Sequence, residues 1–184
     1  MEQVNQFLDA RGRGGIKPGL DRVKTLLQAI DHPEKKFKSV HIAGTNGKGS
    51  TLTYITTCME ASDYKVGTFI SPSITKRNDM IQINRNPITD QNFLDQFNRL
   101  LPSINELDKQ DNPASAFEII VAIAFGYFAD NVDLALIETG MGGLDDATNG
   151  IDPILTIITT IGMDHSAFLG NTYQEIATHK AGII

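Results

Sequence analysis

The stretch that most constrains the fold is a glycine-rich segment between a predicted strand and a predicted helix. Apolar residues begin it near position 40, three glycines surround Lys48, and Ser50 and Thr51 open the helix. Glycines let backbone N–H groups converge on phosphate oxygens without a Cβ in the way. The helix N-terminus adds partial positive charge, Lys48 adds a full one, and Ser50 or Thr51 can hold Mg²⁺. The segment therefore predicts a phosphate-binding loop, with these candidate nucleotide-binding residues: Gly44, Thr45, Asn46, Gly47, Lys48, Gly49, Ser50 and Thr51.

This segment departs from the general P-loop pattern G-x-x-x-x-G-K-[ST] at two places. Ile42 stands where the first glycine belongs, and Gly49 separates Lys48 from Ser50. An ordinary glycine-rich turn between a strand and a helix is the alternative interpretation.

The order of predicted elements indicates an α/β fold with a mostly parallel sheet flanked by helices. Strands are predicted at 39–43, 66–70, 81–83, 133–137 and 154–161, the last as a central strand. The helices between them include one started by Pro18, one capped by Thr89 and broken or kinked at Pro102, one over 117–128, and one after the Thr172 capping box. Ligands of such sheets bind outside the carboxyl ends of the strands.

Four candidate groups fall at predicted strand ends, namely the phosphate loop, Ser71, Glu138 and His165. Glu138 either holds Mg²⁺ or acts in catalysis, or it caps a turn. Asp164 and His165 form either a structural turn or a catalytic or metal site. Lys180, taken alone, reads as a surface lysine of a helix.

Composition limits the class of protein. The 184 residues are 41% hydrophobic and 21% charged, as in an ordinary globular protein, and no apolar run reaches the length of a membrane span. The net charge of −6 argues against a nucleic-acid binder. One cysteine, Cys58, predicted in the core, and a start without a signal-peptide pattern fit the cytoplasm.

Basic residues are nevertheless clustered in three places. They are Arg11 with Arg13, the lysines at 35, 36 and 38, and Lys76 with Arg77. These residues are either solvated loop charges or a local attraction for an anionic substrate.

Several motifs follow one another in a fixed order along the chain. They are Ile16-Lys17-Pro18-Gly19-Leu20, the phosphate loop from His41 to Ser50, Ser71-Pro72, Phe117-Glu118, Ile137-Glu138-Thr139-Gly140-Met141-Gly142-Gly143, Asp146-Ala147-Thr148-Asn149, Asp164-His165, Leu169-Gly170-Asn171-Thr172 and Lys180-Ala181-Gly182-Ile183. The series resembles the N-terminal, ATP-binding domain of the folylpolyglutamate synthase/dihydrofolate synthase family of Mur-type ligases, over most of residues 16–184.

The resemblance implies an ATP-dependent ligase with the Mur-type central-domain fold. ATP would phosphorylate the carboxylate of a folate or of dihydropteroate, and L-glutamate would attack the acyl phosphate. Lys48, His165 and Lys180 would be catalytic. Ser50, Ser71 and Glu138 would surround Mg²⁺, His165 would join a second ion, and Lys180 would be carboxylated into an oxygen ligand. A monomer without nucleic-acid or membrane partners is expected.

Two departures from the family bear on its substrate and its extent. Leu144 and Met80 stand where the family often has arginine, which leaves the choice between dihydropteroate and folylpolyglutamate open. Family members carry a second α/β domain beyond this point, so 1–184 is expected to be a truncated ATP-binding domain that is inactive alone. The alternatives are another Mur-type ligase, which typically has threonine where Gly49 stands, and a non-catalytic nucleotide-binding module.

Overall fold

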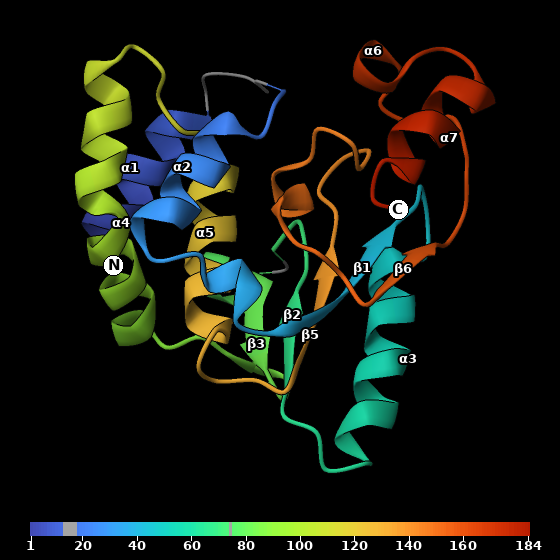
Figure 1. Cartoon of the computed structure of the whole chain (residues 1–184), viewed down its shortest axis with the longest axis horizontal. Helices are drawn as coiled ribbons and strands as arrows, with labels where there is room; N and C mark the ends of the chain where they lie inside the picture. The colour runs from blue at the N-terminus through green and yellow to red at the C-terminus, as the bar shows by residue number, and fades with distance from the viewer. Residues whose placement is uncertain (13–17, 74) are drawn as a thin grey trace.

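The computed structural model of the chain describes residues 1–12, 18–73 and 75–184 (Figure 1). Arg13, the two glycines that follow it, and the motif residues Ile16 and Lys17 lie outside the described residues, as does Ile74. The helices are α1 (Glu2–Gly12), α2 (Asp21–Ala29), α3 (Lys48–Glu60), α4 (Asp90–Lys109), α5 (Ala116–Phe128), α6 (Ser166–Leu169) and α7 (Tyr173–Ala181). The strands are β1 (Lys38–Ala43), β2 (Val66–Phe69), β3 (Ile81–Ile83), β4 (Asn86–Pro87), β5 (Leu134–Glu138) and β6 (Leu155–Ile158).

The described strands form one six-stranded sheet in the order β4-β3-β2-β5-β1-β6. Strands β2, β5, β1 and β6 are parallel, with Val40 of β1 opposite both Leu136 of β5 and Leu155 of β6. Strands β3 and β4 are antiparallel additions beside β2. The predicted mostly parallel sheet is confirmed, and the parallel strands end at one edge.

Helices cover both faces of this sheet, as a parallel sheet requires. Figure 1 shows α1, α2, α4 and α5 on one side and α3 on the other. Side chains of β5 alternate between the two layers: Ala135 and Ile137 join the large core under α5, whereas Leu134 and Leu136 join the cluster that contains Leu52 of α3. The phosphate-loop helix is thereby fixed against the sheet by its apolar face.

Helix α5 lies at the centre of the helical layer and is apolar almost all round. It begins at a capping box, in which Ser115 Oγ accepts from Glu118 N and Glu118 Oε2 accepts from Ser115 N. The Glu118 carboxylate also pairs with the buried Arg22 of α2 at 3.0 Å. The predicted helix at 117–128 is confirmed, and the ion pair locks its first turn to α2.

Four local predictions differ from the structure. Helix α2 begins at Asp21, because Gly19 has a left-handed φ of 112° and separates Pro18 from the helix. Pro102 does not break the helix, because it lies inside one continuous helix α4, whose apolar face packs into the core.

Cys58 is exposed, since α3 turns its other face toward the sheet. Strand β6 ends at Ile158 and is an edge strand of the described sheet, with Leu155 about half exposed. Among the helices that the structure describes, none combines the length and the apolar character needed to cross a membrane.

Candidate functional site

The glycine-rich segment forms a loop between β1 and α3, at the carboxyl edge of the sheet. Gly44 and Gly47 have positive φ angles of 153° and 85°, and Gly47 is the N-cap of α3. The first helical bond runs from Thr51 N to Gly47 O at 2.9 Å, so the amides before Thr51 have no acceptor within the helix. These N–H groups and the helix dipole form the concavity that phosphate oxygens require.

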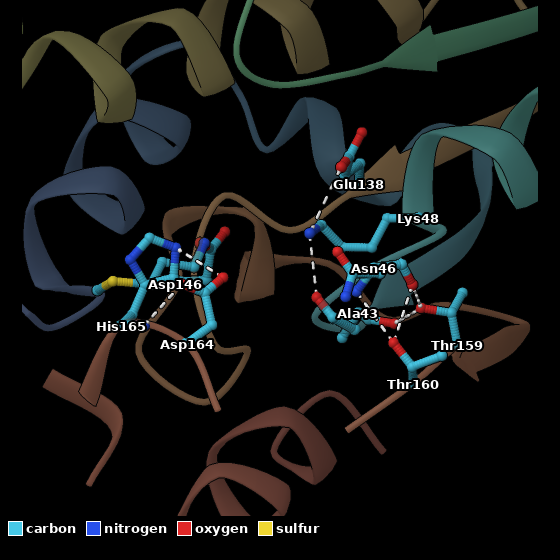
Figure 2. A network of polar contacts seen from close by, with 11 residues as sticks. Ala43, Asn46, Lys48, Glu138, Asp146, Thr159, Thr160, Asp164 and His165 are labelled. Atoms are coloured by element: carbon cyan, nitrogen blue, oxygen red, sulfur yellow. Dashed lines mark hydrogen bonds and ion pairs between the residues drawn. The ribbon is translucent and has the colours of Figure 1, made fainter. Parts of the chain in front are cut away.

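Lys48 and Glu138 lie together at this loop (Figure 2). Lys48 Nζ donates to Gly44 O at 3.0 Å and lies 3.7 Å from Glu138 Oε1. Burial raises the pKa of Glu138, and the charge of Lys48 and a hydrogen bond from the Ser71 backbone oppose this rise. A Cβ added to Gly49 would lie 3.7 Å from Glu138 Oε2, so the carboxylate faces the start of α3. Three strand ends therefore meet here, those of β1, β2 and β5.

The oxygen donors at this loop fit the expected Mg²⁺. The site offers one buried carboxylate, that of Glu138, and the hydroxyl of Ser50 at the start of α3. Such a pair fits a magnesium ion that takes its other ligands from phosphates and water. Among residues 1–12, 18–73 and 75–184, no group of three or more His, Cys, Asp and Glu side chains could hold a metal ion. Glu138 and Ser50 are thus the oxygen donors at this loop that could contribute to a magnesium site completed by phosphate and water.

Lys180 is buried on α7, with 3% of its surface exposed, so the interpretation as a surface lysine is wrong. Burial lowers the pKa of Lys180, the charge of Lys48 lowers it further, and Asp164 and Asp146 raise it. The Lys180 ammonium is therefore close enough to Lys48 for their charges to interact, so α7 lies near the phosphate loop.

His165 sits at the N-cap of α6 in a left-handed conformation, with φ of 49°. Its Nε2 lies 3.5 Å from Asp164 Oδ2, and half of its side-chain surface is exposed. His165 lines the large cavity described below, as does Ser71. The turn and the site interpretations of Asp164 and His165 are thus compatible.

A cavity of about 990 Å³ adjoins the site. Its lining comes from α1, the segment after β2, the start of α5, the loop after β5 and α6, and it includes Asn5, Lys76, Met80, Phe117, Met141 and Phe168. Arg77 also lines it, but its guanidinium is held by Asn5 at 2.9 Å and by Asp9 at 2.5 Å. Leu144 is not among the residues that line the cavity, and its N–H donates to His179 O at 2.8 Å.

A buried polar relay fixes the cavity wall to β1. His41, fully buried, lies with Nε2 2.8 Å from Thr148 Oγ1, which donates to Asp146 Oδ1 at 2.5 Å. Asp146 Oδ2 accepts from Met141 N at 2.7 Å. Because an ionised carboxylate only accepts, the Thr148 hydroxyl donates to it and accepts from His41 Nε2–H. Burial lowers the pKa of His41 to about 4 and raises the pKa of Asp146.

Sequence reasoning assigned no role to His41, nor to Thr159 and Thr160, which contact the phosphate loop (Figure 2). Each had a weak signal. His41 is a polar residue within an apolar strand, and the two threonines are polar residues near the end of the predicted strand 154–161, at the same edge as the other candidates.

The fold and the site define an α/β domain built around a Gly-Lys phosphate loop. A protein-family model described as "Mur ligase middle domain" matches residues 42–184. The chain therefore belongs to the Mur ligase middle-domain family.

Curated and solved relatives point to one branch of that family. The chain is 45% identical to the dihydrofolate synthase/folylpolyglutamate synthase of Bacillus subtilis, over 100% of this chain and 43% of that protein. The Mycobacterium tuberculosis folylpolyglutamate synthase complexed with ADP and AMPPCP superposes with a TM-score of 0.89 at 35% identity, over 99% of this chain and 41% of that chain. The Escherichia coli FolC complex with DHPP and ADP gives a TM-score of 0.90 at 26% identity, over 99% of this chain and 43% of that chain.

These similarities confirm the resemblance drawn from the motifs. The chain spans about two fifths of the length of these relatives.

Proposed function

We propose that this chain is the ATP-binding part of a ligase that joins L-glutamate to a folate or to dihydropteroate. One observation carries the proposal: Lys48 of the phosphate loop lies beside Glu138, and Ser71, whose backbone hydrogen-bonds to Glu138, lines a cavity of about 990 Å³ together with His165. Nucleotide and acid substrate would then meet at the edge of the sheet. The complexes of the two solved relatives with ADP, AMPPCP and DHPP support this pairing of ligands.

The proposed reaction has two steps. An oxygen of the substrate carboxylate attacks the γ-phosphorus of ATP and releases ADP. The glutamate amine then attacks the acyl carbon, and inorganic phosphate leaves. Negative charge grows on the transferred group, so Lys48 and the amides at the start of α3 stabilise it. Bound Mg²⁺ would neutralise further phosphate charge, with Ser50, Ser71 and Glu138 holding it.

Lys180 and His165 are proposed as the remaining catalytic residues and as holders of a second ion. Carboxylation of Lys180 by CO₂ needs a neutral amine, and burial lowers its pKa in that direction. The carbamate would supply oxygen where an ammonium cannot bind a metal ion. Intact mass measurement of the chain in bicarbonate, with Lys180→Ala as the control, tests this modification.

Lys76 is the proposed contact for the anionic end of the acid substrate, because the charge of Arg77 already faces Asp9. We further propose that the protein is a cytoplasmic monomer. Of the two positions at which the family often has arginine, Met80 lines the cavity and Leu144 does not.

Titration calorimetry with Mg²⁺–ATP tests the nucleotide site. Lys48→Met removes a charge-assisted contact, so we expect affinity to fall about tenfold or more. Lys65→Ala is the control, because Lys65 precedes β2 at the opposite edge of the sheet. Equal affinity in the Lys48→Met variant contradicts the proposed nucleotide site.

Hydroxylamine trapping separates the ligase from a nucleotide-binding module without catalysis. An acyl phosphate reacts with hydroxylamine to give a hydroxamate, so the full-length ligase that contains this domain should yield one with ATP and dihydropteroate or a folate. The Lys48→Met variant of the full-length ligase should yield none. Tight ATP binding without any hydroxamate from the wild-type full-length protein favours the binding module.

A further inference from the structure

A short segment after β6 holds the phosphate loop from one side. We call residues 159–162 the strap. Asn46 N donates to Thr160 Oγ1 at 2.9 Å, and Asn46 O accepts from Thr159 Oγ1 at 2.7 Å and from Thr160 Oγ1 at 3.0 Å. Figure 2 shows both threonines on the far side of Asn46 from Glu138.

Thr45 is tied to the same strap. Its N–H donates to Thr160 O at 2.9 Å, and its hydroxyl accepts from Gly162 N at 2.9 Å. A Cβ at Gly44 would overlap the Thr159 hydroxyl, so the loop and the strap are in direct contact. The backbone N–H groups of Thr45 and Asn46 are therefore used by the strap and are not available to a phosphate.

The threonine hydroxyls also set the orientation of one peptide group. A trans peptide places its C=O and the following N–H on opposite sides. Because Asn46 O is held toward Thr159 and Thr160, the N–H of Gly47 points away from the strap. If the Asn46–Gly47 peptide were flipped, its carbonyl oxygen would point away from the strap in place of the N–H, and this oxygen would repel a phosphate.

We propose that Thr159 and Thr160 are positioning residues for nucleotide binding, which fix the Asn46–Gly47 peptide so that its N–H faces the phosphates. The proposal rests on the proposed nucleotide site. In this proposal the backbone N–H groups from Gly47 onward donate to the phosphates, whereas those of Thr45 and Asn46 do not. The strap continues into Asp164 and His165, so the same short segment joins the phosphate loop to the cavity wall.

The test replaces both threonines by valine, which keeps their shape and removes the hydroxyls. The loss of these three hydrogen bonds to Asn46 should weaken Mg²⁺–ATP affinity by about 5- to 50-fold. The double serine variant restores both hydroxyls and should recover most of the affinity. Thr156→Val on β6 is the matched control, since the Thr156 side chain makes no hydrogen bond within the described part of the chain.

Amide hydrogen exchange without nucleotide gives a second, independent measurement. Exchange at Asn46 should be slow in the wild type and in Thr156→Val, and fast in the double valine variant. Wild-type affinity in the double valine variant overturns the proposal, as does slow exchange at Asn46 there. If the wild type binds no nucleotide, the proposed function fails, and the exchange rates alone decide whether the strap fixes the loop.

Discussion

Replacing His41 by glutamine tests how far burial controls the acid stability of this fold. His41 lies on β1 with no exposed surface, and its Nδ1 has no hydrogen-bond partner within the described structure. Burial lowers the pKa of His41 from 6.5 to about 4. A protonated imidazole would need hydration that this part of the core does not offer.

The sign follows from which state binds the proton. Above pH 6.5 the imidazole is neutral in both states and has no effect. Between pH 6.5 and pH 4 only the unfolded chain binds the proton, so the free energy of unfolding decreases as the pH falls. The pKa difference corresponds to about 3 kcal/mol in full, of which about 2 kcal/mol is lost by pH 5.

Urea denaturation of wild type and His41→Gln at pH 7.5 and pH 5 measures this effect. Taking the difference between the two proteins cancels other titrating groups, including Glu138 and Asp146. We expect the wild type to lose about 2 kcal/mol more than the variant on acidification. Val40→Ala, a destabilising change beside His41, is the control and should retain the wild-type pH dependence. Parallel pH profiles for wild type and His41→Gln would refute the reasoning.

Two further changes test the loop and the core. Gly44→Ala places a Cβ on the Thr159 hydroxyl, so we expect more than tenfold weaker ATP binding by calorimetry; unchanged binding would mean that the loop and the strap are not in contact. Arg22→Met leaves the buried Glu118 carboxylate without its ion-pair partner, so we expect about 3–5 kcal/mol of destabilisation in urea. A loss under 1 kcal/mol would show that this pair contributes little.

The sequence by itself determined the local features of the site and the class of fold. The glycines and Lys48 define the phosphate loop within one short segment of the sequence, from Gly44 to Gly49. The N-cap at Thr89 and the capping box at Thr172 fix two helix starts in the same way. Such signals survive in sequence because each depends on residues three or four positions apart.

Tertiary structure alone decided which distant residues share the site. Asn46 and Thr159 are 113 positions apart, and His41 and Thr148 are 107 apart. They meet because β6 lies beside β1 and the loop after β5 folds back over β1, an order that periodicity does not encode. Lys180 is a further case, since a lysine near a helix end reads as exposed until packing buries it. Desolvation and long-range hydrogen bonding are properties of the assembled layers, and so they appear only in the folded molecule.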